Sequence, residues 1–318
     1  MTALGTAEAA AGELGVGRLP IGEHPDGASL SLPVAVLEGA DDGPTLYVQA
    51  GSDGDELNGV ATVGRLLRRL DPAAVSGTIL VVAVANLPGF RQSTHRNPID
   101  DTKLNRAYPG DPEGSTSERI AAATFEAAAR ADLVLDLHQG STSRMIDEVR
   151  VRCGRHHELH EECLELAKVF DCGYVLDQQG PDGQLARAVC DEGVPAVDPE
   201  LGGSVGVDES SVEVGLRGLE NVLAAYGLVD GEPERRRQTR VRGFDQYHSP
   251  RGGLTELAVD LGAEVDRGDE LYHVHSLLGE HLETVTADDP GVLWRARRRP
   301  HVTSGEYVCS VGIDVDVY

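Results

Sequence analysis

The stretch from Gly51 to Gly59, GSDGDELNG, decides the fold of this chain. It follows an apolar run, TLYVQA at residues 45–50, and precedes a helical pattern of leucines at residues 66–70. A buried strand is therefore expected to run into a glycine-rich turn that opens a helix. In open α/β sheets such a turn lies at the carboxyl end of a strand, where ligands bind.

Two acidic residues of this turn, Asp53 and Glu56, stand three positions apart, so both carboxylates can face one point. Two oxygens that converge at a strand end suit a divalent cation. Acidic residues are also common in the first turn of a helix, where the helix dipole favours them. Taken alone, the pair leaves both interpretations open.

The composition favours a large, acidic, globular protein. The chain has 318 residues, of which 53 are acidic and 28 basic, and its formal net charge is −25. Hydrophobic residues make up 40% of the chain and fall in periodic runs, which argues against disorder. A surface this acidic argues against nucleic acid and anionic membranes as partners, and it is compatible with a homo-oligomer. It is typical of a halophilic protein in a salt-rich cytoplasm, so we expect a cytoplasmic location.

The five cysteines are scattered and lack the paired spacing of a zinc knuckle. We therefore expect reduced, partly buried thiols rather than disulfides or a metal site. They are Cys153, Cys163, Cys172, Cys190 and Cys309.

Strands alternate with helices along residues 1–230, after a loose, polar start over residues 1–30. This alternation predicts an α/β sheet of mainly parallel strands. A charged, proline-bearing segment at 230–240 is typical of a linker. Residues 241–318 show only short strands broken by turns, which predicts a small all-β domain, with Trp294 on its surface.

Two further chemical groups follow predicted strands. His138 ends the run DLVLDLH, and Glu200 follows the strand near residues 194–197. Each has an ordinary explanation, since a strand histidine is often a core residue and a glutamate can cap a helix. However, all these groups are expected at one edge of the sheet, where two carboxylates and an imidazole match a catalytic divalent site.

A long loop over residues 86–113 supplies cations and an amide, at Arg96, Asn105 and Arg106. Loops of this length inside a compact domain are usually functional. Arginine binds carboxylates in a bidentate manner and stabilises a developing oxyanion. Salt bridges to an acidic surface are the alternative explanation.

The order of these motifs resembles the succinylglutamate desuccinylase and aspartoacylase family, relatives of the zinc carboxypeptidases. The family pattern is G-x-H-G-D-E-x-x-G, then R-x-x-P-x-D…L-N-R-x-F-P-G, then D-L-H, then E-x-G. The matching stretches here are Gly51–Gly59, Arg96–Gly110, Asp136–His138 and Glu200–Gly202. The resemblance implies a three-layer α/β domain of the zinc carboxypeptidase type with a mainly parallel, mixed central sheet. It also implies a metal-dependent hydrolase domain at 1–230 and a C-terminal β domain at 241–318.

By this resemblance Asp53, Glu56 and His138 would hold one Zn²⁺ per chain. The family has histidine at the first of these positions, and this chain has aspartate. Aspartate also binds zinc, at about 2.0–2.2 Å. A site richer in oxygen tolerates harder ions such as Mn²⁺, so Mn²⁺ is an alternative cofactor.

The resemblance also implies the remaining roles. Glu200 would be the general base that activates water, and Arg96 would polarise the scissile carbonyl. Asn105 and Arg106 would hold the substrate carboxylate. The implied reaction is hydrolysis of a small N-acyl amino acid to a carboxylate and an amine. The alternatives are a zinc carboxypeptidase acting on small peptides and a metal-free binding protein that kept the fold.

Overall fold

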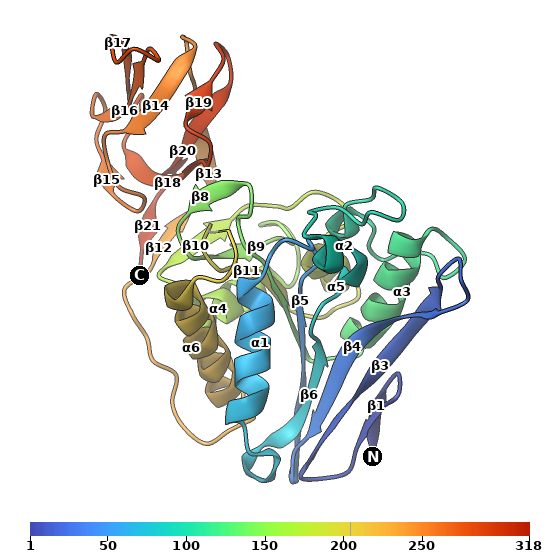
Figure 1. Ribbon diagram of the computed structural model, residues 1–318. Helices are drawn as coiled ribbons and strands as arrows, with labels where there is room; N and C mark the ends of the chain where they lie inside the picture. The colour runs from blue at the N-terminus through green and yellow to red at the C-terminus, as the bar shows by residue number, and fades with distance from the viewer. Residues whose placement is uncertain (204) are drawn as a thin grey trace.

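The computed structural model describes residues 1–203 and 205–318. Its centre is a ten-stranded mixed sheet. The strands of this sheet, in chain order, are β3 (Glu13–Glu23), β4 (Ser29–Glu38), β5 (Asp41–Ala50), β6 (Ser76–Val82), β7 (Leu133–Leu137), β9 (Glu148–Val151), β10 (Tyr174–Asp177), β11 (Ala196–Glu200), β12 (Thr239–Val241) and β21 (Asp316–Val317). Across the sheet they run β21-β12-β10-β9-β11-β7-β5-β6-β4-β3 (Figure 1). The expected α/β fold is confirmed.

Helices cover both faces of this sheet and make three layers (Figure 1). On one face α1 (Asn58–Arg69), α4 (His160–Phe170) and α6 (Glu209–Ala225) pack together. On the other face lie α3 (Thr116–Ala128) and α5 (Leu185–Cys190), and the short α2 (Leu87–Gln92) lies beside the acidic turn. Among the described residues, no helix has the length and apolar character needed to cross a membrane.

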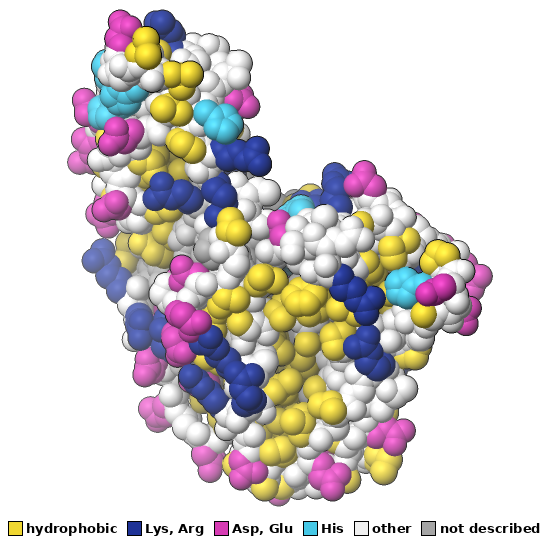
Figure 2. Space-filling model, viewed as in Figure 1, with side chains coloured by type: hydrophobic (Ala, Val, Ile, Leu, Met, Phe, Trp, Pro, Cys, Tyr) yellow, Lys and Arg dark blue, Asp and Glu magenta, His cyan; other side chains and the backbone are white. Residues whose placement is uncertain are grey.

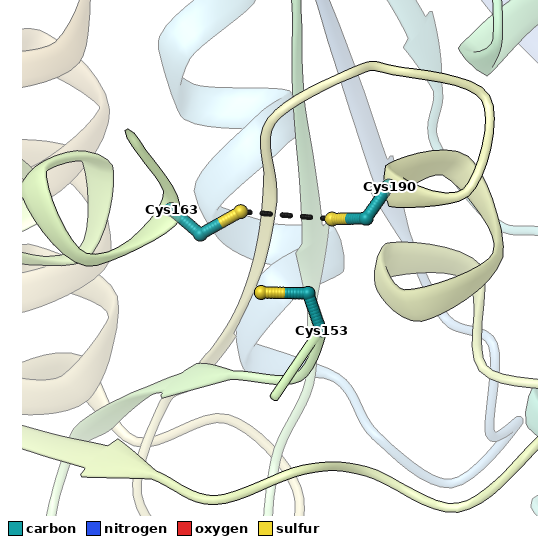
Figure 3. A group of neighbouring side chains, drawn as sticks. All are labelled: Cys153, Cys163 and Cys190. Atoms are coloured by element: carbon teal, nitrogen blue, oxygen red, sulfur yellow. Dashed lines mark hydrogen bonds between the residues drawn. The ribbon is translucent and has the colours of Figure 1, made fainter. Parts of the chain in front are cut away.

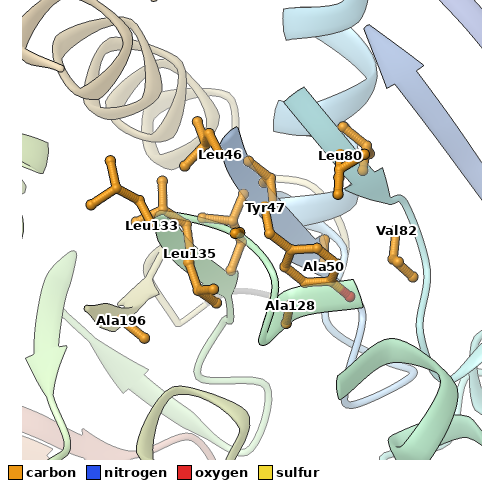
Figure 4. Packing of buried hydrophobic residues seen from close by; sticks show 14 of the residues in the cluster. Leu46, Tyr47, Ala50, Leu80, Val82, Ala128, Leu133, Leu135 and Ala196 are labelled. Carbon is orange, nitrogen blue, oxygen red and sulfur yellow. The ribbon is translucent and has the colours of Figure 1, made fainter. Parts of the chain in front are cut away.

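The core lies around β7, β5 and β6, which pair in parallel. All five residues of β7 are buried, and β6 is buried from its second residue onward. Figure 4 shows Leu46, Tyr47, Leu80, Leu133 and Leu135 packed together there. Strands covered by helices on both faces need continuous apolar runs, which these sequences supply.

The register of the central strands aligns their carboxyl ends. Ala50, the last residue of β5, pairs with Leu137, the last residue of β7. The next residue, His138, forms a parallel bridge with Glu200, the last residue of β11. The turn that begins at Gly51 and the side chains of His138 and Glu200 therefore meet at one edge of the sheet.

The C-terminal strands form two smaller sheets beside the large one (Figure 1). Their strands are β13 (Gly243–His248), β14 (Gly253–Leu257), β15 (Glu264–Val265), β16 (Glu270–His275), β17 (His281–Thr286), β18 (Gly291–Arg297), β19 (His301–Val302) and β20 (Tyr307–Ile313). One sheet runs β13-β20-β18-β15, and the other runs β17-β16-β14-β19. A strand of the first part of the chain, β8 (Ser143–Met145), also pairs with β18. We call this group of strands the C-terminal β unit.

Two expectations from the sequence were wrong. The segment before residue 30 is not loose, because β1 (Thr2–Leu4), β2 (Ala7–Ala9) and the edge strand β3 lie there. The half-exposed, glycine-bearing sequence of β3 gave a weak apolar signal. Trp294 is fully buried rather than on a surface. It packs between the large sheet and the C-terminal β unit, and it donates a hydrogen bond to Glu148.

Candidate active site

A cavity of about 230 Å³ lies at the edge where the central strands end. Every site residue predicted from the sequence except Arg96 lines it: Asp53, Glu56, Asn105, Arg106, His138 and Glu200. A larger cavity of about 830 Å³ lies near Glu264 and Pro290 in the C-terminal β unit, away from these groups. The smaller cavity is therefore the candidate site, because it holds the convergent titratable groups.

The acidic turn forms one wall of the cavity. Helix α1 begins only at Asn58 and has no acidic residue in its first turn, so Asp53 and Glu56 belong to the turn before the helix and not to the helix itself. Gly51 takes a positive φ of 65°, and a Cβ at Gly54 would lie 2.2 Å from a backbone carbon of α2. These glycines let the turn fold tightly, and Asp53 and Glu56 are only 2% and 5% exposed.

His138 is oriented by carboxylates on both ring nitrogens. Its Nδ1 lies 3.1 Å from Glu56, and its Nε2 lies 3.0 Å from the buried Asp136. Burial alone would lower the pKa of His138, but Asp136 and Glu56 raise it overall. A carboxylate behind a histidine fixes its ring for a ligand on the other nitrogen, which here faces Glu56.

Glu56 contacts His138 but is also buried close to Asp53. Burial, together with the charge of Asp53, raises its pKa to about 7, although the hydrogen bond to His138 opposes this shift. A divalent cation between these carboxylates would remove the cost of holding them ionised in the interior.

Glu200 forms the opposite wall and carries its own cation. Arg150 Nη1 lies 2.5 Å from Glu200, and Arg150 Nε lies 2.5 Å from Glu148. Burial opposes ionisation, yet the Arg150 guanidinium holds the pKa of Glu200 below its ordinary value. Glu200 is thus a carboxylate at neutral pH and can accept a proton.

The donor set fits a divalent ion. Within the described parts of the chain, the buried Asp53 Oδ1 has no hydrogen-bond partner. Ligand atoms of Asp53, Glu56 and His95 lie within 4.8 Å of one another, and Glu56 also contacts His138. Carboxylate oxygens with imidazole nitrogens suit zinc, and a set this rich in oxygen also suits manganese.

Of the three predicted groups on the long loop, two reach the cavity. Asn105 is buried, with its Nδ2 3.2 Å from His138 Nε2. Arg106 lines the cavity, donates to its neighbour's carbonyl, and has no carboxylate partner among residues 1–203 and 205–318. Arg96 is the exception, since its side chain donates to the carbonyl of Asp101 and does not line the cavity.

Sequence reasoning missed two cavity residues on the same loop, His95 and Lys103. The pattern R-x-x-P places its arginine three residues before the proline, and three residues before Pro98 stands His95, not Arg96. Counting back from the proline would have found it. For Lys103 the only signal is that it is one of two lysines in the chain.

The sequence comparison decides the family. The pattern of the succinylglutamate desuccinylase/aspartoacylase catalytic domain matches residues 42–226, more than half of the chain. The chain belongs to this family. It is therefore a hydrolase that acts on amide bonds, as the motifs predicted.

Relatives in this family are similar to this chain over nearly its whole length. The N-alpha-acetyl-L-2,4-diaminobutyric acid deacetylase of Halomonas elongata is 30% identical over 92% of this chain and 89% of its own length. A succinylglutamate desuccinylase from Silicibacter sp. TM1040 superposes with a TM-score of 0.84 at 28% identity, over 96% of this chain and 95% of that one. The product-bound ectoine utilization protein EutE (DoeB) from Ruegeria pomeroyi also gives 0.84 at 28% identity, over 95% of each chain.

Proposed function

We propose that this member of the family is a metal-dependent deacylase that cleaves the amide bond of a small N-acyl amino acid. One observation carries the proposal: Asp53 and Glu56, with ligand atoms grouped near His95 and a contact from Glu56 to His138, share a cavity with an arginine-paired glutamate. A volume of about 230 Å³ lies below the range of about 300–1,000 Å³ that is usual for drug-sized ligands, so it suits a small substrate.

Asp53, Glu56 and His138 would hold the ion, which is Zn²⁺ in this proposal, with Mn²⁺ as the alternative. The ion would supply Lewis-acid polarisation of the scissile carbonyl. Asp136 holds the His138 ring in place through Nε2. This second contact supports His138 as a ligand through Nδ1.

Glu200 is the proposed general base. Arg150 keeps it ionised, so its carboxylate can take a proton from the attacking water and pass it to the leaving amine. Arg106 is proposed to bind the substrate carboxylate, because it lines the cavity and faces no carboxylate of its own in the described residues. Asn105 would assist it from the same loop. We assign no catalytic role to Arg96, which does not line the cavity.

A metal-free binding protein is the second candidate, and one contact favours it. Lys103 Nζ lies 3.2 Å from Asp53 Oδ2 and could neutralise that carboxylate without a metal. A deacylase needs a general base such as Glu200, whereas a protein that only binds its ligand does not. A carboxypeptidase would use the same groups on small peptides.

Metal-depleted protein should be assayed with and without Zn²⁺ or Mn²⁺ against several N-acyl amino acids. Nα-acetyl-2,4-diaminobutyrate, N-succinylglutamate and N-acetylaspartate cover the chemistry of the relatives' names, and dipeptides test the carboxypeptidase alternative. We expect metal-restored hydrolysis of at least one acyl amino acid in preference to the dipeptides. His138→Ala should abolish both activity and stoichiometric metal. Sub-stoichiometric metal in the parent, without hydrolysis of any substrate, would favour the binding protein.

We also propose that the protein works in a salt-rich cytoplasm. Its formal net charge is −25, and Figure 2 shows acidic side chains on both parts of the face in view rather than in a single patch. Salt screens such self-repulsion, so the melting temperature should rise between dilute and molar KCl. An unchanged melting temperature would contradict this proposal.

A further inference from the structure

The cavity contains an imidazole at a position where the family pattern has arginine. The pattern has histidine at the first ligand position and arginine three residues before the proline. This chain has Asp53 at the first position and His95 at the second. The two side chains meet, with His95 Nε2 3.5 Å from Asp53 Oδ1. The chain has thus lost an imidazole on the turn and gained one on the facing loop.

The hydrogen bonds of His95 prepare it as a ligand. Its Nδ1 lies 3.1 Å from Asp55 Oδ1, so Nδ1 carries the proton and donates a hydrogen bond to that carboxylate. Its Nε2 lies 2.8 Å from the ammonium of Lys103, so Nε2 is the acceptor. A histidine with a carboxylate behind one nitrogen and a lone pair on the other matches the usual arrangement of a metal-bound histidine.

The ammonium group of Lys103 occupies a position where His95 and Asp53 stabilise a positive charge. Its Nζ touches both His95 Nε2 and, at 3.2 Å, Asp53 Oδ2. A lone pair and a carboxylate oxygen that share one ammonium can share one metal ion instead. The second oxygen of Asp53 is buried, faces His95 and has no hydrogen-bond partner in the described parts of the chain.

We propose that His95 is a further metal ligand, which restores the imidazole that Asp53 removed, and that Lys103 competes with the ion for the same two groups. The ligand set then becomes Asp53, Glu56, His95 and His138. This inference rests on the proposed metal-dependent function and adds a ligand from the loop to it.

Metal affinity tests this directly and needs no substrate. Zn²⁺ binding should be measured by chelator competition, and Co²⁺ binding by visible absorption, at a pH where histidine is neutral. His95→Ala should weaken Zn²⁺ binding by about 100-fold and change the Co²⁺ spectrum. Lys103→Met should tighten binding by about two- to fivefold, the scale of one partly exposed charge contact. His301→Ala, an exposed histidine of the C-terminal β unit, is the matched control and should change nothing.

A double substitution adds a second test, in which the expected result is recovered metal binding, and a misfolded protein would not give that result. Asp53→His with His95→Arg restores the family pattern and should bind one ion within about tenfold of the parent, whereas His95→Arg alone should lose it. If the parent binds metal and His95→Ala leaves affinity and spectrum unchanged, the inference fails while the proposed function stands. If the parent binds no metal and Lys103→Met does not create binding, both fail.

A separate observation concerns three of the cysteines. Cys153 follows β9, Cys163 lies on α4, and Cys190 ends α5. Their sulfur atoms lie within 4.8 Å of one another, and the Cys163 and Cys190 sulfurs are 3.6 Å apart (Figure 3). All three are buried, and none lines the cavity of the active site.

The spacing of these thiols fits a soft metal ion. Sulfur atoms that bind one ion at about 2.3 Å in a trigonal plane stand about 4.0 Å apart. Hydrogen bonds among the three thiols lower the pKa of Cys153 and raise the pKa of Cys163 and Cys190, so Cys153 is the first to become a thiolate. Cys153 also lines a third cavity, of about 480 Å³, through which an ion could enter. The structure assigns to Cys153, Cys163 and Cys190 a three-thiolate site for a thiophilic ion such as Cu⁺.

Titration with Cu⁺ against a competing chelator, under reducing conditions, tests this site. We expect one ion per chain, and slower alkylation of three of the five thiols of the parent with Cu⁺ than without it. Cys163→Ala should weaken binding by about 100-fold. Cys309→Ala, a buried thiol outside the cluster, should not. The assignment would be overturned if no thiol were protected, or if a Cys163–Cys190 disulfide formed in place of the ion. The protection measurement uses the parent protein, so it does not depend on whether any variant folds.

Discussion

Glu56 and Glu200 are buried carboxylates in one cavity whose pKa values move in opposite directions. Glu56 is 5% exposed and Glu200 is 7% exposed, so burial disfavours ionisation of both. The pKa of Glu56 rises to about 7, because burial and the charge of Asp53 outweigh its hydrogen bond to His138. The pKa of Glu200 falls despite burial, because Arg150 contacts it.

The difference separates two sides of the site. The proposed metal side consists of Asp53, Glu56, His95 and His138, and its two carboxylates are contacted by Lys103 and His138. The base side consists of Glu200 with Arg150 and Glu148, and its cation is supplied by a neighbouring strand. In the proposed function an ion would take the place of Lys103 at Asp53, whereas Arg150 remains with Glu200.

The largest expected effect concerns the base side. Glu200→Gln keeps the shape of the side chain but cannot accept a proton. Turnover should fall by about 10²–10⁴-fold, the usual contribution of a general base. Metal content and melting temperature should stay near those of the parent, because the ligands lie on the other side. Activity within a few-fold of the parent would move the base to another group.

A second substitution removes the cation of the base side. Arg150→Met leaves Glu148 and Glu200 buried without it, and such a loss costs about 3–5 kcal/mol of stability. Urea unfolding measures the effect. The control is Arg130→Met, whose pair with Glu126 is exposed, and it should cost less than about 1 kcal/mol. Equal costs for the two variants would show that the Arg150 contacts do not neutralise the base side.

The sequence was sufficient where backbone periodicity places a group at a strand end. Glu56, His138 and Glu200 were found in this way, because buried strands have a clear apolar signal and parallel strands end at one edge. The edge strand β3 lacked that signal, and the burial of Trp294 depends on packing between parts distant in sequence.

The loop was harder to predict than the strands. His95 lines the cavity and Arg96 does not. The loop sequence has no periodic pattern that predicts which of these two neighbours points inward. The thiol cluster was missed for a related reason. Cys153, Cys163 and Cys190 come together only through the packing of β9, α4 and α5, which sequence spacing does not report.

A third prediction compares two arginines of the same loop. Arg106→Ala should raise KM for an N-acyl amino acid by about 10–100-fold, the scale of a charged hydrogen bond of about 1.5–3 kcal/mol, with a smaller change in kcat. Arg96→Ala is the matched control and should stay within about twofold, because its side chain donates to the Asp101 carbonyl outside the cavity. The reverse result would return the substrate-facing role to Arg96.

The smallest expected effect is a difference in how pH changes stability with and without metal. In metal-depleted protein the folded pKa of Glu56, about 7, lies above its ordinary value of 4.5. A carboxyl group whose pKa is raised on folding stabilises the fold at low pH, and this contribution is lost as pH rises through the folded pKa. Asp198, whose pKa rises to about 6 through burial, has the same sign. The melting temperature should therefore fall between about pH 5 and pH 8.

Bound metal should reverse this trend, because the ion takes the place of the protons and binds more tightly as they leave. The melting temperatures of loaded and depleted protein should diverge by several degrees as pH rises, which differential scanning fluorimetry can follow. Glu56→Gln should reduce the slope of the depleted protein, since an amide does not titrate, while Asp198 and the histidines with raised pKa values keep the rest of it. Glu200 cannot produce the same slope, because its pKa lies below 4.5 and its titration falls outside this window. Parallel curves for loaded and depleted protein would mean that the carboxylates of the metal side do not bind the ion, and the contrast between the two sides would have to be explained without a metal.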